Sequence, residues 1–135
     1  MIEGTYELFL REKVNEISPN AYNNISNIRS LPLSTSLKIL TLLVQFACVG
    51  QNSAPIMLAR KQLKTIPSDW LNQHLPSVTD KAITLEDEWE YRRFLELLDE
   101  AQLTNLLNLY INEGMKSSNE EVREAAEDFS NMNSN

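Results

Sequence analysis

Glycine is scarce in this chain, and that scarcity constrains the fold more than any other feature of the sequence. Only Gly4, Gly50 and Gly114 occur among the 135 residues. Positive-φ turns, β-bulges and phosphate-binding loops draw on glycine because it has no Cβ atom. The chain therefore has few positions for the turns of a β-rich fold or for a glycine-rich nucleotide loop, and helical structure is favoured.

Apolar residues recur at three- and four-residue steps along most of the chain, which is the spacing of one helical face. The pattern predicts an all-α fold of seven or eight short antiparallel helices joined by short turns. Pro76 is expected to end one helix and leave 76–83 as a loop, and Gly114 is expected to end another. The expected helices cover roughly 5–17, 19–28, 34–49, 53–66, 68–75, 85–100, 103–114 and 118–129.

The length fits one hydrophobic core, because single domains of this size are the most common. We expect residues 1–129 to form that domain and 130–135 to be a disordered tail. Ser18, Thr84 and Ser118 are expected to cap helices. The side chains of the first helix that are expected to point toward the core are Tyr6, Phe9, Leu10, Val14 and Ile17. The residues expected to be nearly fully buried elsewhere are Leu40, Leu43, Leu63, Leu107 and Ile111.

The segment 117–129, SSNEEVREAAEDF, resembles the opening of a HEAT-type repeat helix, in which a polar turn leads into a Val-Arg-x-Ala-Ala face. The helix pairs at 34–66 and 86–114 resemble such repeats more loosely. The resemblance implies helix pairs stacked as a short array. A compact irregular bundle is the alternative, since small residues at this spacing suit any close contact between helices.

Charge is distributed unevenly along the chain. Residues 1–66 carry four acids against seven bases, a net +3, whereas residues 67–135 carry fifteen acids against five bases, a net −10. A field of this sign repels phosphate backbones and attracts cations, so nucleic acid is an unfavourable partner for the C-terminal half. A protein with a basic surface is the favoured partner, and the sequence does not indicate an oligomeric state.

The residues that could support chemistry are few. His74 is the only histidine and no local motif gives it a nucleophile or an orienting carboxylate, while Cys48 lies in an apolar run that disfavours its thiolate. Glu86 and Glu90 share a helical face, but no Glu-x-x-His motif follows them, so no metal or other cofactor is expected. A small enzyme with dispersed catalytic residues and a structural subunit of a larger assembly remain alternatives.

The expected location is the cytoplasm, because a lone cysteine cannot close an intramolecular disulfide and Met1 is followed by polar, charged residues. Residues 37–49 are the most apolar run, and they fall short of the roughly 20 residues of a membrane-spanning helix. No membrane association is expected.

Surface recognition is the function that this composition favours, and we expect a non-enzymatic protein-interaction module. Its size, acidity and helical content make it similar to the immunity proteins that neutralise cationic nuclease toxins. Acids would speed the encounter with a basic partner, and an aromatic side chain would provide the buried anchor. The residues expected to contact the partner are Glu86, Glu90, Trp89, Tyr91, Glu120 and Glu121.

Overall fold

Helices account for all of the regular secondary structure in the computed structural model, which describes residues 4–50 and 52–133. No strand occurs in those residues, so the all-α prediction is confirmed. The elements are α1 (Thr5–Ile17), the 3₁₀ segment η1 (Ala21–Ser30), α2 (Leu33–Cys48), α3 (Ser53–Leu63), α4 (Ser68–Ala82), α5 (Glu88–Glu100), α6 (Thr104–Met115) and α7 (Glu120–Asn133). The resemblance to a HEAT-type repeat stays a prediction.

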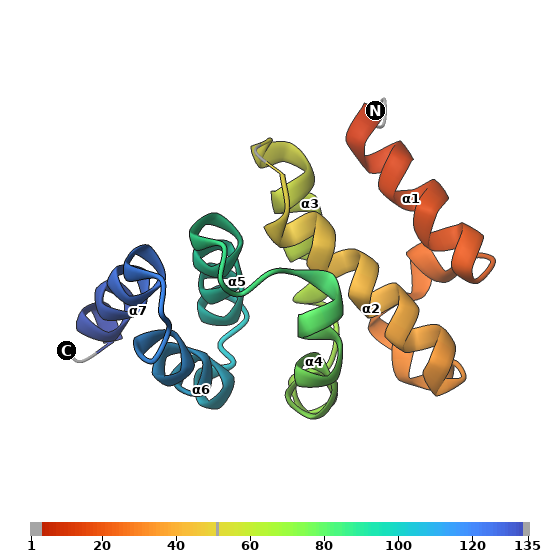
Figure 1. Ribbon diagram of the computed structural model, residues 1–135. Helices are drawn as coiled ribbons and strands as arrows, with labels where there is room; N and C mark the ends of the chain where they lie inside the picture. Colours follow the sequence, from red (N-terminus) through yellow and green to blue (C-terminus); the bar gives the residue numbers. More distant parts are fainter. Residues whose placement is uncertain (1–3, 51, 134–135) are drawn as a thin grey trace.

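The helices lie in nearly their chain order, from α1 at one end of the molecule to α7 at the other (Figure 1). Two central helices, α2 and α5, pack against most of the others. Helix α2 packs against α1, η1, α3, α4 and α5, while α5 packs against α2, α6 and α7. The contact between α2 and α5 therefore joins the N-terminal helices to the C-terminal pair.

The core consists of aliphatic and aromatic side chains that these helices turn toward one another. All five residues predicted to be nearly fully buried are at most 4% exposed, which confirms the inward faces of α2, α3 and α6. Trp70 on α4 is also buried. No helix in the described part of the chain is long and apolar enough to cross a membrane.

The segment after α1 is helical but not α-helical. Tyr22, Ile25 and Ile28 are buried at strict three-residue intervals, which matches the three residues per turn of a 3₁₀ helix. Asn20 takes a left-handed conformation with φ 64°, and the Asn24 side-chain amide donates a hydrogen bond to its carbonyl at 3.0 Å. These asparagine contacts compete with α-helical hydrogen bonding, so the predicted helix over 19–28 forms at Ala21–Ser30 as 3₁₀ turns interrupted by non-helical backbone at Asn24 and Asn27. Asn20, rather than the predicted Ser18, is its cap position.

Pro76 lies inside α4 rather than after it, and the predicted loop at 76–83 was wrong. A proline in a helix removes one hydrogen bond, here to the carbonyl of Asn72 four residues earlier. Both Pro76 and Asn72 are exposed, so water can solvate the freed carbonyl. On the opposite face Val78 and Ala82 continue the buried side of the helix, and their burial favours continuation.

Several other predicted boundaries also differ from the structure. Helix α3 ends at Leu63 rather than near 66, and α5 begins at Glu88 rather than near 85. Gly114 lies within α6, which continues to Met115, so it does not end the helix. Helix α7 continues to Asn133, so residues 130–133 of the predicted disordered tail are helical. Residues 134–135 of that tail lie outside the described residues.

Candidate functional site

The predicted acidic residues come from two separate segments that the fold places side by side. The Ser117 hydroxyl donates a hydrogen bond to the Glu86 carboxylate, and the Asn119 side-chain amide donates one to the Glu86 backbone carbonyl at 2.8 Å. These contacts fix the turn before α7 against the turn before α5. The starts of α5 and α7 therefore lie on one side of the molecule, and their acids form a shared surface.

The start of α5 is held by two hydrogen bonds from backbone N–H groups to side-chain carboxylates. Asp87 accepts a hydrogen bond from the backbone N–H of Glu90 at 3.0 Å, so Asp87, and not Thr84, caps the helix. The Glu90 carboxylate in turn accepts from the backbone N–H of Thr84 at 3.0 Å. Glu90 is thus held toward the connection between α4 and α5.

The start of α7 is capped by the residue next to the predicted one. Asn119, rather than Ser118, accepts a hydrogen bond from the backbone N–H of Glu121 at 3.0 Å through its side-chain oxygen. Asn119 thus contacts both Glu121 and the Glu86 backbone. Its two hydrogen bonds position the acids of α7 relative to those before α5.

Like charges are held close together across these two helix starts. The pKa of the Glu121 carboxyl is raised, chiefly because the negative charge of Glu88 lies beside it and secondarily through a hydrogen bond with Glu88, with Glu124 and Glu120 adding to the effect. We define the acidic face as Glu86, Glu88, Glu120, Glu121 and Glu124. Carboxylates whose like charges repel each other attract an added cation.

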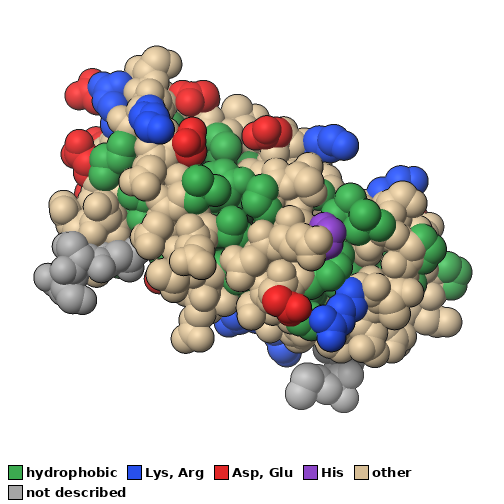
Figure 2. Space-filling view, turned by 90° about the horizontal axis from the view of Figure 1, so that it is seen from below, with side chains coloured by type: hydrophobic (Ala, Val, Ile, Leu, Met, Phe, Trp, Pro, Cys, Tyr) green, Lys and Arg blue, Asp and Glu red, His purple; other side chains and the backbone are tan. Residues whose placement is uncertain are grey.

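Arginine partly offsets the charge of the acidic face. Arg92 contacts Glu88 at 3.1 Å and Asp128 at 3.2 Å, and so links α5 to α7. Glu88 and Arg92 are four residues apart on α5, a spacing that favours an ion pair within a helix. On the face seen in Figure 2, acidic and basic side chains are mixed over the C-terminal end of the molecule, while apolar side chains gather near the middle. The negative charge is therefore concentrated on particular surfaces and not spread over the whole C-terminal half.

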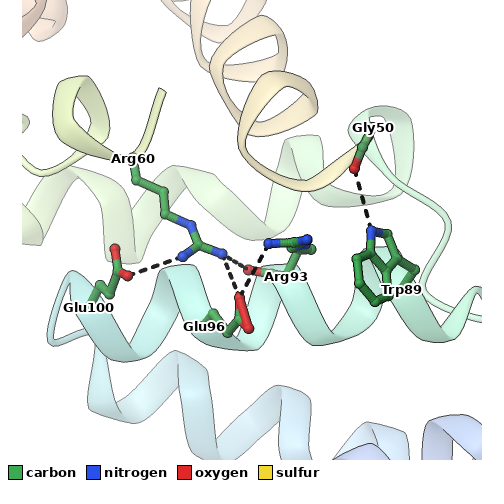
Figure 3. Close-up of polar contacts among 6 residues, drawn as sticks. All are labelled: Gly50, Arg60, Trp89, Arg93, Glu96 and Glu100. Atoms are coloured by element: carbon green, nitrogen blue, oxygen red, sulfur yellow. Dashed lines mark hydrogen bonds and ion pairs between the residues drawn. The ribbon is translucent and has the colours of Figure 1, made fainter. Parts of the chain in front are cut away.

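The two aromatic residues predicted to contact the partner, Trp89 and Tyr91, differ in their exposure. Trp89 is 49% exposed, with the Arg93 guanidinium 4.5 Å from its ring centroid and its indole N–H donating to the Gly50 carbonyl at 3.4 Å (Figure 3). Tyr91 is only 1% exposed, and its hydroxyl donates to the Tyr110 carbonyl at 2.8 Å. Tyr91 thus lies in the core and not on the predicted binding surface. Its helical spacing to Phe94 and Leu98 was the sequence signal for that burial.

Two further acids of α5 form ion pairs with a buried arginine of α3. Arg60 of α3 contacts Glu96 at 2.8 Å and Glu100 at 3.0 Å, and it also donates to the Arg93 carbonyl at 3.4 Å (Figure 3). The Arg60 side chain is 9% exposed, whereas the two carboxylates are about 40% exposed. Arg60 and Arg93, whose guanidinium lies 4.0 Å from the Glu96 carboxylate, together offset the charges of Glu96 and Glu100. These two acids therefore contribute less to the field around α5.

A second surface feature, absent from the sequence predictions, is a groove of about 620 Å³ between α1, the end of α2 and the α4–α5 connection. We call it the apolar groove. Tyr6 and Phe9 are 45% and 46% exposed there, although the periodicity of α1 predicted that they point inward. Leu10 and Val14 are the buried residues of α1. The residues that define the apolar groove here are Tyr6, Phe9, Phe46, Val49, Ile83, Asp80, Lys81 and Glu90.

The reactive side chains considered in the sequence occupy ordinary packing environments. His74 is half-buried against Trp70, with ring centroids 4.6 Å apart. Cys48 is fully buried, and this burial raises the pKa of its thiol from 9.0 to about 12. Among the described residues no group of three or more metal-ligating side chains could hold an ion. These environments provide no activated nucleophile.

Comparisons with known proteins give no relative for this chain. No protein-family model matches the sequence, and neither a curated protein nor a solved structure matches it.

Proposed function

We propose that this protein is a non-enzymatic interaction module whose acidic face binds a protein with a basic surface. The observation that carries the proposal is the pair of hydrogen bonds from Ser117 and Asn119 to Glu86, which fixes the acids at the starts of α5 and α7 on one surface. There the negative charge of Glu88 raises the pKa of Glu121. A lysine or arginine placed beside these two carboxylates would relieve their repulsion and make charge-assisted hydrogen bonds. An immunity-type inhibitor of a cationic toxin is one specific form of this function.

Two features favour recognition of a protein over binding of a free cation. The acids lie along two helices that are fixed to each other through Glu86 and Asn119, so they present a preformed surface. Trp89, at the start of α5, adds an exposed aromatic side chain of the kind that anchors protein interfaces. Proteins that meet through such a surface associate quickly, and salt slows their association.

The test compares capture of proteins from the native lysate by three forms of this chain. They are the unchanged protein, the variant Glu120→Lys/Glu121→Lys, and a control variant Glu12→Lys that changes an exposed acid on α1. A partner retained by the first and third forms but lost with the second would bind the acidic face.

The association rate of that partner should fall at least about tenfold between roughly 20 and 300 mM NaCl, because salt screens the charges that steer the encounter. Lysine at Glu120 and Glu121 should slow association more than it speeds dissociation. If capture and rates are indifferent to both changes, the acidic face is not the binding surface.

A further inference from the structure

The apolar groove is an exposed hydrophobic surface that the core does not use. Three of its large apolar side chains, Tyr6, Phe9 and Val49, are each 45–46% exposed and lie together in one concavity. Single exposed apolar residues are common on soluble proteins, but a clustered set in a hollow is typical of a binding site. The cluster comes from α1 and the end of α2, which are far apart in the sequence.

The lining of the groove is held in place by contacts at both of its ends. The Phe9 and Phe46 rings lie 5.9 Å apart between centroids, which fixes α1 against α2. The Tyr6 hydroxyl accepts a hydrogen bond from the Asn52 side chain at 3.2 Å. The aromatic side chains are therefore positioned before any partner arrives, which lowers the entropy cost of binding.

The charged residues of the groove indicate what kind of apolar partner fits. Asp80 and Glu90 contribute two carboxylates and Lys81 one ammonium group, so the lining carries a net negative charge. Glu90 is held at this position by its hydrogen bond from Thr84. The groove therefore has its carboxylates at fixed positions beside the aromatic side chains of α1.

We infer that the apolar groove binds an amphipathic helix of a partner protein, with bulky apolar side chains in the groove and lysine or arginine beside Asp80 and Glu90. The inference rests on the proposed class of function, a protein-interaction module, but it does not depend on the acidic face. Helices that dock in grooves use apolar residues along one face and charges on the flanks. The half-exposed lining would leave a small apolar molecule largely in contact with water.

The probe is a fluorescein-labelled synthetic helix of leucine and lysine, about 14 residues long, with leucine on one face. We expect it to bind the unchanged protein with a Kd on the order of 10–100 μM in fluorescence anisotropy. Two comparison peptides separate charge from shape. One carries glutamate in place of lysine, the other has the leucine and lysine positions scrambled, and each should bind at least about tenfold more weakly.

Matched variants on α1 locate the binding site. Phe9→Gln should weaken binding of the leucine–lysine helix about tenfold or more, whereas Leu8→Gln should leave it unchanged. Leu8 and Phe9 are equally exposed, at 46%, but only Phe9 lines the groove. Circular dichroism of both variants checks that the fold is retained. Equal binding by the two variants would overturn the inference.

A second matched pair examines the charged lining. Asp80→Asn should weaken binding of the leucine–lysine helix severalfold, because it removes one carboxylate from the groove. Asp99→Asn is the control: Asp99 is exposed like Asp80 but lies at the far end of α5, so its replacement should leave binding unchanged. If the two variants bind alike, the charge complementarity assigned to the groove is wrong.

Three further measurements distinguish a partner helix in the apolar groove from another binding site or another occupant. If binding of the leucine–lysine helix is lost in Glu120→Lys/Glu121→Lys but kept in Phe9→Gln, the acidic face binds the helix and the groove does not. Saturable binding of decanoate in the groove without binding of the helix would assign it to a small apolar ligand. Self-association in sedimentation equilibrium that Phe9→Gln abolishes would assign it to a second copy of the chain. Each of these three results would overturn the inference.

Discussion

Adding a single methyl group at Gly114 should destabilise the protein, although alanine is a better helix former than glycine. A Cβ atom at this position in α6 would lie 2.5 Å from Cζ of Tyr91, closer still to the Tyr91 hydroxyl oxygen, and 3.0 Å from Cβ of Ala126. Tyr91 is 1% exposed and hydrogen-bonded to the Tyr110 carbonyl, so its ring has no free space into which to move. Helices α5, α6 and α7 meet at this point.

The size of the effect follows from three opposing contributions. Alanine in place of glycine within a helix gains about 1 kcal/mol of helix propensity. Overpacking a core typically costs about 1–3 kcal/mol, and displacing the Tyr91 hydroxyl forfeits a hydrogen bond worth about 1 kcal/mol. The loss outweighs the gain, so Gly114→Ala should lower the free energy of unfolding by about 1–3 kcal/mol.

Chemical denaturation followed by far-ultraviolet circular dichroism measures this difference. Asn112→Ala is the matched control, because Asn112 is exposed on the same helix and its replacement should stabilise the protein by up to about 0.7 kcal/mol. Tyr91→Phe should cost less in the Gly114→Ala background than in the unchanged protein, since it removes the nearest clashing atom. If Gly114→Ala is as stable as the unchanged protein, the described packing of Tyr91 on α6 is incorrect.

The remaining predictions concern helix caps, a buried charge and alkaline pH. Asp87→Ala and Asn119→Ala should each lower the free energy of unfolding by about 1 kcal/mol, and Ser118→Ala by far less, as measured by urea denaturation. Arg60→Met should cost about 1–3 kcal/mol in the same assay, because it removes the hydrogen bonds between α3 and α5; a neutral result would mean that this network adds no stability. The thiol of Cys48 has a pKa of 9.0 in the unfolded chain and about 12 in the folded protein, so between these values only the unfolded chain releases the proton. The free energy of unfolding should therefore fall by about 1 kcal/mol per pH unit across that interval. Cys48→Ala should reduce this slope.

The sequence by itself determined where most helices form and which faces become the core. The first helix covers 5–17 as its periodicity predicted, and Leu40, Leu63 and Ile111 are buried as expected. Such patterns can be read locally, because a helix places residues three and four apart on one face. Glycine scarcity and the absence of strand patterning were sufficient for the all-α class.

Packing between helices determined two features that the sequence patterns did not predict, the continuation of α4 past Pro76 and the place of Gly114 inside α6. Pro76 remains inside α4 because Val78 and Ala82 gain burial beyond it, and Gly114 is required within α6 because Tyr91 packs on it. Neither effect is visible in local sequence, since each depends on a neighbouring helix.

The two candidate surfaces arose in different ways. The acids of the acidic face could be identified from the charge asymmetry, but their arrangement on one surface required the fold to fix the turn before α7 against the turn before α5. The apolar groove could not be predicted, because the stripe of α1 has the same periodicity whether or not another helix covers it. Only α1's position against α2 leaves Tyr6 and Phe9 half-exposed beside Ile83, since burial depends on which elements meet and not on the pattern of one helix.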